Sequence, residues 1–79
     1  MKVHEIKIEQ MFFDRNISGS KSCEVRKNDR DYQVGDRIIF ITPNGEIHNR
    51  KLFEVTHLLP GGEFGIEAGW CVLSIKPIF

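Results

Sequence analysis

Residues 37–45 read Arg37-Ile38-Ile39-Phe40-Ile41-Thr42-Pro43-Asn44-Gly45, and this stretch decides the expected fold. An unbroken apolar run bounded by polar residues is typical of a strand that is covered on both faces. The Pro-Asn-Gly that follows it is a hairpin signal. We therefore expect a central strand over residues 37–42 and a return strand over roughly residues 50–59, a segment rich in β-forming residues.

Alternation and turn signals predict the remaining elements on either side of this hairpin. Residues 3–8 alternate with His4, Ile6 and Ile8 on one face, which indicates a half-buried strand. From residue 9 the apolar spacing becomes helical and stops at Gly19, a natural left-handed terminator. Residues 21–26 and 70–76 read as two further strands. A helix of about nine residues is unstable alone, so it has to pack on the sheet.

Length and composition limit the class of protein. The chain has 79 residues, of which 41% are hydrophobic and 28% charged, as in an ordinary single soluble domain. A chain of this length has a modest core, which excludes two domains and a large α/β enzyme that encloses its substrate. We expect one α+β domain over residues 1–79, mostly β. A compact β-barrel around one short helix is the best closure, because it leaves no exposed strand edges.

The balance of charge argues against strong nonspecific binding to nucleic acid. Eleven Lys and Arg residues offset eleven Asp and Glu residues, whereas proteins dedicated to duplex binding usually carry a basic excess. Any nucleic-acid binding should therefore be local to one cleft. No apolar run approaches the roughly 18 residues of a membrane span, and the first ten residues contain no signal-peptide core. A cytoplasmic protein without a membrane partner is the default expectation.

Cysteine and histidine spacing predicts no metal and no cofactor. Cys23 and Cys71 lie far apart in the sequence and read as two core thiols rather than a disulfide. The histidines (His4, His48 and His57) lack the spacing of metal ligands. His4 opens the first strand near the expected helix, which makes it a candidate for the wall of a cleft.

The segment most informative about chemistry is residues 19–26. Residues two apart on a strand share a face, so Glu24 and Arg26 should project together, opposite Cys23. Lys21 stands at the mouth of the strand and can reach the same area. A carboxylate between two cations suits an anionic or carbonyl-bearing ligand. The alternative is a surface ion-pair ladder that stabilises the strand by less than about 1 kcal/mol.

The polar loop that follows leaves two interpretations open. Lys27 and Arg30, with Arg26, are candidates for contacts to phosphates, but aspartates interleave with them and nearly cancel their charge. The loop is therefore either a phosphate-binding patch or a self-paired, solvated segment. Tyr32 beside it is a candidate for stacking on a base or, alternatively, for capping the barrel.

The motif Gly19-x-Lys21-x-x-Glu24-x-Arg26 resembles the GxKxxExR signature of the ASCH superfamily, relatives of the PUA domain. Four longer phrases, at residues 4–8, 24–32, 61–65 and 72–75, resemble a family of small bacterial and phage proteins described as a domain of unknown function and placed among the ASCH/PUA-like folds. The similarity spans nearly the whole chain.

The resemblance implies a five- or six-stranded PUA-like barrel whose helix covers one opening. It also implies that RNA or a modified nucleoside binds in a cleft beside Gly19, Lys21, Glu24 and Arg26. One branch resembles an amidohydrolase that removes an acyl group from a cytidine derivative with the signature lysine, a threonine and a later glutamate. Lys21 matches that lysine, Glu24 stands in the threonine slot, and Glu63 is a candidate for the later carboxylate.

Three functions follow as hypotheses. The first is a module that binds RNA, single-stranded nucleic acid or a modified nucleoside through Gly19, Lys21, Glu24 and Arg26, with Lys27, Arg30 and Tyr32 beside them. The second is an amidohydrolase or nuclease in which Lys21 and Glu24 are the catalytic candidates. The third is a protein-interaction module without catalysis. Ions that neutralise one another are better suited to holding a ligand than to moving protons, which favours the first hypothesis.

Overall fold

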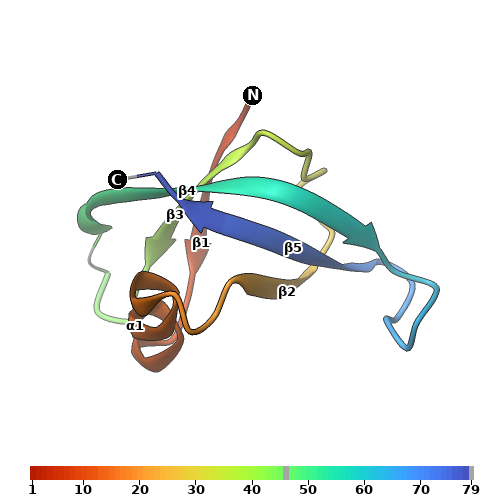
Figure 1. The fold of residues 1–79 in the computed structure, drawn as a ribbon, viewed down its shortest axis with the longest axis horizontal. Coiled ribbons are helices and arrows are strands. Elements are labelled where there is room, and N and C mark those ends of the chain that lie inside the picture. The colour runs from red at the N-terminus through yellow and green to blue at the C-terminus, as the bar shows by residue number, and fades with distance from the viewer. Residues whose placement is uncertain (46, 79) are drawn as a thin grey trace.

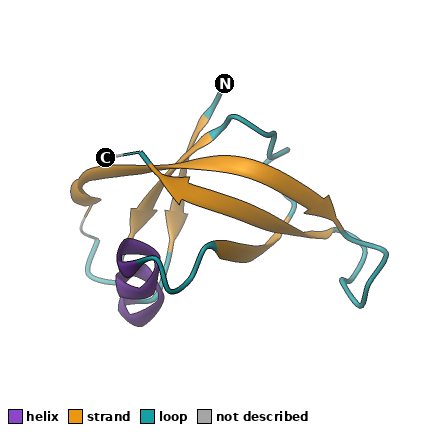
Figure 2. Ribbon diagram, in the orientation of Figure 1, coloured by secondary structure: helices purple, strands orange, loops and turns teal. Residues whose placement is uncertain are grey.

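Five strands and one helix make up the described part of the fold (Figures 1 and 2). The computed structural model describes residues 1–45 and 47–78, and the side chains of residues 47–50, including that of His48, lie outside the description. The elements in chain order are β1 (Val3–Lys7), α1 (Gln10–Ser18), β2 (Cys23–Lys27), β3 (Arg37–Ile41), β4 (Ile47–Pro60) and β5 (Trp70–Pro77). These bounds agree closely with the expected elements, except that β2 begins at Cys23 rather than at residue 21 and that β4 is longer at both ends.

All five strands belong to one sheet with the order β1-β3-β4-β5-β2. β3 pairs with β1 in parallel and with β4 as an antiparallel hairpin, so the predicted strand and hairpin are confirmed. The expected cover on both faces is not, because Ile39 and Ile41 are only half-buried. β4 continues into a second antiparallel pairing with β5, which in turn pairs with β2. The register of β4 shifts between Val55 and His57, and such a bulge increases local twist. Figure 1 shows the long β4 and β5 ribbons curving across the molecule.

The two end strands of this order, β1 and β2, face each other without a ladder between them. Two arginine side chains reach β1 instead, one from β2 and one from the loop that follows it. Arg26 Nη2 donates to the carbonyl O of Lys7 at 3.0 Å, and Arg30 Nη1 donates to the carbonyl O of Glu5 at 2.6 Å. The mostly β, α+β fold is therefore confirmed as a curled half-barrel, in which side chains rather than backbone groups join the two edges.

The core lies on the concave side of the sheet. Its buried apolar members come from β1 and the residue after it, from β3, β4 and β5, from α1 and from the loop before β3: Ile6, Ile8, Phe13, Tyr32, Ile38, Phe40, Phe53, Val55, Cys71, Leu73 and Ile75. Helix α1 contributes Phe13, whose ring meets that of Phe40 edge-on at 6.4 Å between centroids. This packing supplies the partner that so short a helix needs.

With nine residues, α1 is also too short to cross a bilayer, and the described residues contain no longer helix.

The prediction of two core thiols is half wrong. Cys71 is buried, but Cys23 is exposed. The reason is the register with β5, which places Glu24 beside the buried Leu73 and Val25 beside Val72. Neighbours in register share a face of the sheet, so Glu24 points toward the core and Cys23 points outward.

Candidate functional site

The end of α1 positions the first residue of the motif. Gly19 has φ +84°, a left-handed conformation that side chains other than glycine rarely adopt, and its N–H donates to the carbonyl O of Asn16. The N–H of Lys21 then donates to the carbonyl O of Arg15 at 3.1 Å. This turn reverses the chain over the last helical turn and directs it into β2.

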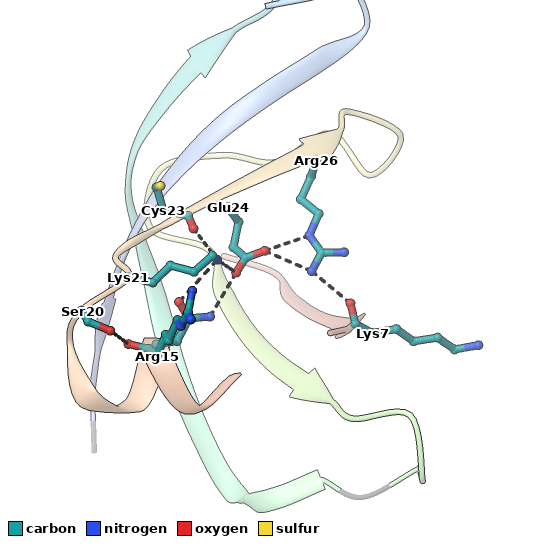
Figure 3. A network of polar contacts seen from close by, with 8 residues as sticks. Lys7, Arg15, Ser20, Lys21, Cys23, Glu24 and Arg26 are labelled. Atoms are coloured by element: carbon teal, nitrogen blue, oxygen red, sulfur yellow. Dashed lines mark hydrogen bonds and ion pairs between the residues drawn. The ribbon is translucent and has the colours of Figure 1, made fainter. Parts of the chain in front are cut away.

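Glu24 is the centre of the site and is only 5% exposed. Its Oε1 accepts from Asn16 Nδ2 at 3.0 Å and contacts Lys21 Nζ. Its Oε2 accepts from Arg26 Nε at 3.2 Å and from Arg26 Nη2 at 3.1 Å (Figure 3). Both oxygens are thus occupied by donors, two of which are cationic, as a buried carboxylate requires. The predicted convergence of Lys21, Glu24 and Arg26 is observed.

Lys21 has acceptors on several sides. Besides Glu24, its Nζ donates to the carbonyl O of Cys23 at 2.6 Å and lies 3.5 Å from Asn16 Oδ1. The ammonium also lies 5.7 Å from the centroid of the Phe12 ring, which is within the range of a cation–π contact. An ammonium has three N–H groups, so these oxygens use the whole donor capacity of Lys21 in the free protein.

Arg26 connects the motif to the opposite edge strand. Its Nη2 contacts both Glu24 and the carbonyl O of Lys7, which Figure 3 shows on the far side of the guanidinium from the carboxylate. Among the described residues, Nη1 of Arg26 has no hydrogen-bond partner. The side chain is one-quarter exposed. Arg26 is therefore both a brace across the open edge and a donor that a ligand can reach.

A hollow of about 610 Å³ lies over these residues. Its lining combines the polar motif with apolar and aliphatic groups: Lys7, Ile8, Glu9, Phe12, Lys21, Cys23, Glu24, Val25, Arg26 and Pro43. We call it the motif hollow. Ligand sites in proteins typically measure about 300–1,000 Å³ and combine apolar walls with a few convergent polar groups, and the motif hollow has both features.

The other predicted residues fall into two groups. Lys27 and Arg30 line a separate, adjacent hollow together with Arg26. Tyr32 is 2% exposed, and its ring packs edge-on against His4 at 4.7 Å between centroids. The ring belongs to the core in this structure, which favours the packing interpretation of Tyr32 over the stacking one. Its side chain also lines the hollow shared by Lys27 and Arg30. Burial raises the pKa of its phenol above the ordinary 10.0.

His4 is buried rather than exposed to the motif hollow. Its Nε2 lies 2.8 Å from Asp36 Oδ2, and the same carboxylate accepts from the backbone N–H groups of Lys2 and Gln33, each at 3.0 Å. Burial alone would raise the pKa of Asp36, but these hydrogen bonds outweigh it and lower the pKa below the ordinary 3.8. The pair ties the start of β1 to the loop before β3.

Glu63 has no place in the site. It is exposed in the loop between β4 and β5, which Figure 1 shows at the opposite end of that hairpin from α1, and it lines neither hollow. Within residues 1–45 and 47–78, no three side chains of the metal-ligating kinds gather at one point. Glu63 therefore does not supply the later carboxylate that the amidohydrolase branch would require beside Lys21 and Glu24.

Sequence reasoning missed Asn16 and the carbonyl of Lys7. Asn16 is 1% exposed and bonds Glu24 directly. A signal for it existed, because Asn16 stands three residues after Phe13 and so falls on the helix face that turns inward. Asparagine is a poor helix former, and its presence on that face indicates that its side chain makes a buried hydrogen bond. Nothing local could have indicated the Lys7 carbonyl, which is a backbone group.

Comparison with known proteins agrees with this fold. A protein of Escherichia phage P2, described as an uncharacterized 12.9 kDa protein in the GpA 3′ region, is 45% identical over 38 residues, which are 48% of this chain and 35% of the phage protein. The chain thus matches about a third of that relative's length. A crystal structure described as hypothetical protein PH0355 superimposes with a TM-score of 0.72 at 21% identity, over 99% of this chain and 100% of the other. That likeness concerns the fold alone. The model of the family DUF3850, a domain of unknown function, matches residues 3–75, and the chain belongs to this family.

Proposed function

We propose that this protein is a PUA-like module that binds RNA or a nucleoside in the motif hollow. The observation that carries the proposal is the buried Glu24 carboxylate held between Lys21 and Arg26 at the base of a hollow with apolar walls. The resemblance of residues 19–26 to the ASCH signature supports the same ligand class. The barrel-like curl of the sheet is compatible with that superfamily's fold.

The chemistry of the hollow suits a heterocyclic base. The cluster carries two cations and one carboxylate, so its excess positive charge favours carbonyl or anionic groups. Phe12, Ile8 and Val25 supply apolar surface on which a flat ring can lie. Arg26 Nη1 is a donor that a base carbonyl can use without breaking the existing network.

The contacts of the cluster favour binding over turnover. An amidohydrolase or nuclease would need Lys21 or Glu24 to take up a proton from substrate or water. Lys21 Nζ already faces acceptors from Asn16, Cys23 and Glu24, while both oxygens of Glu24 face donors. A proton-moving role would require this network to open first. We therefore place binding ahead of catalysis.

Amide NMR titration tests the proposal. The four common nucleosides, an N-acylated cytidine and short RNA oligonucleotides are each added to the labelled protein. We expect shifts of amides at residues 7–9 and 19–26. The variant Arg26→Gln should weaken these shifts, whereas Arg37→Gln is the matched control. Arg37 has a similar exposure and pairs with Glu54, outside the motif hollow.

The same samples separate the three hypotheses. Release of acetate from the acylated cytidine, lost in Lys21→Ala, would support the enzyme. Unchanged amide positions with every nucleoside and oligonucleotide at millimolar concentration would contradict the proposal and favour a protein-interaction module.

A further inference from the structure

A second hollow adjoins the motif hollow across Arg26. It measures about 440 Å³ and is lined by Glu5, Ile6, Lys7, Arg26, Lys27, Asp29, Arg30, Tyr32 and Ile41. We call it the Arg30 hollow. Lys7 and Arg26 line both hollows. The two hollows are therefore neighbours, with Lys7 and Arg26 at their shared border.

The Arg30 hollow differs from the motif hollow in charge. Four cations line it against the two carboxylates of Glu5 and Asp29. The other aspartates that seemed to cancel this charge in the sequence are used elsewhere. Asp36 is buried against His4, and Asp31 accepts from the side chain of Gln33 and does not line the hollow. The cations that line the hollow therefore outnumber the carboxylates, and the net charge of its lining is positive.

Two guanidiniums in this hollow are already positioned by the backbone of β1. The carbonyl groups of Glu5 and Lys7, two residues apart on one strand edge, hold Arg30 Nη1 and Arg26 Nη2. Among the described residues, Arg26 Nη1 and Arg30 Nη2 and Nε have no hydrogen-bond partner. Positioned guanidinium N–H groups bind phosphate oxygens well, because less side-chain freedom is lost on binding.

We propose that the natural ligand carries a phosphate group, which binds in the Arg30 hollow while the attached base lies in the motif hollow. This inference rests on the proposed function and narrows it from nucleosides to nucleotides. The Lys27 side chain has no hydrogen-bond or ion-pair partner among the described residues. It lines the Arg30 hollow and not the motif hollow, so it adds a third cation to the phosphate site.

Calorimetric titration with matched ligands tests the inference. Each common nucleoside is compared with its 5′-monophosphate, its 3′-monophosphate and a dinucleoside monophosphate. The last three distinguish a terminal phosphate from an internal diester. We expect at least one phosphorylated form to bind about tenfold more tightly than the nucleoside, the effect of one charge-assisted contact. The gain should shrink as salt is raised.

Arg30→Gln and Lys27→Gln should each remove most of this gain and leave the affinity for the free nucleoside unchanged. Lys27→Gln keeps the test valid if Arg30→Gln disturbs the β1 edge, and Arg37→Gln is again the control. Equal affinity for nucleoside and nucleotide would overturn the inference but leave the proposed function standing. If both variants still bound the phosphorylated ligand more tightly than the nucleoside, by the same factor as the unmodified protein, the inference would also be overturned. Absence of binding by every nucleoside, nucleotide and RNA oligonucleotide would overturn both.

Discussion

The side-chain amide of Asn16 donates to Glu24 Oε1 at 3.0 Å, and this buried bond joins helix α1 to strand β2. Within the described part of the chain, neither residue has another side-chain hydrogen bond to the opposite element. The bond therefore determines where the helix stands relative to the motif strand, and with it the shape of one wall of the motif hollow.

Asn16→Ala tests this bond. It removes a donor from a buried carboxylate, so we expect the free energy of unfolding to fall by about 1–3 kcal/mol. Urea denaturation followed by circular dichroism measures it. Gln10→Ala is the control, because Gln10 makes an exposed bond to Asp14 on the same helix, and it should change stability by less than about 0.5 kcal/mol. Equal losses for the two variants would contradict the role of Asn16.

Glu24→Gln tests the ionic cluster and keeps the size of the side chain. It leaves Lys21 and Arg26 facing one another without the shared anion, so we expect a loss of about 1–3 kcal/mol in the free energy of unfolding. The matched control is Glu54→Gln, which breaks the more exposed pair with Arg37 and should cost less than about 1 kcal/mol. A Glu24 variant as stable as the Glu54 variant would show that the cluster adds nothing to stability.

The lowered pKa of Asp36 leads us to expect that the protein loses stability in acid. The pKa of this carboxyl is lower in the folded protein than its ordinary 3.8, so the folded state favours the ionised carboxylate. The resulting stabilisation is present above about pH 4 and is lost as the pH falls through the folded-state value. We expect the free energy of unfolding of Asp36→Asn to fall less steeply between pH 5 and pH 2 than that of the unmodified protein.

Parallel pH curves for the two proteins would refute this role of Asp36. Asp14→Asn serves as the comparison, because Asp14 is exposed on α1 and its carboxylate accepts an exposed hydrogen bond from Gln10. Its curve should follow that of the unmodified protein.

The two thiols should react at different rates. Cys23 is exposed beside the motif hollow, whereas Cys71 is fully buried, and burial raises the pKa of its thiol above the ordinary 9.0. An aromatic disulfide reagent added to the native protein should modify one thiol quickly and the second only after denaturant is added. The variant Cys23→Ser should lose the fast phase. Simultaneous reaction of both thiols would contradict the buried position of Cys71.

Much of the fold could be predicted because its signals are local. The apolar run before Pro43 indicated β3 and its hairpin, and the alternation of residues 3–8 indicated the face of β1 that carries Ile6. The absence of a ladder between β1 and β2 was not predictable, because it depends on how far the whole sheet curls. The buried position of Tyr32 depends likewise on a chain reversal that no local pattern encodes.

The sequence alone determined which groups of the motif share a face. A strand alternates its side chains with a period of two, so Glu24 and Arg26 had to project together, and Gly19 had to end the helix that precedes them. Only the tertiary structure decided that the Glu24 face turns toward the core. It does so because β2 pairs with β5 in a register that places Glu24 beside Leu73. It also decided that Arg26 reaches the carbonyl of Lys7, a contact between residues 19 positions apart. Local geometry follows from neighbouring residues, whereas contacts at such separations exist only after the strands have paired.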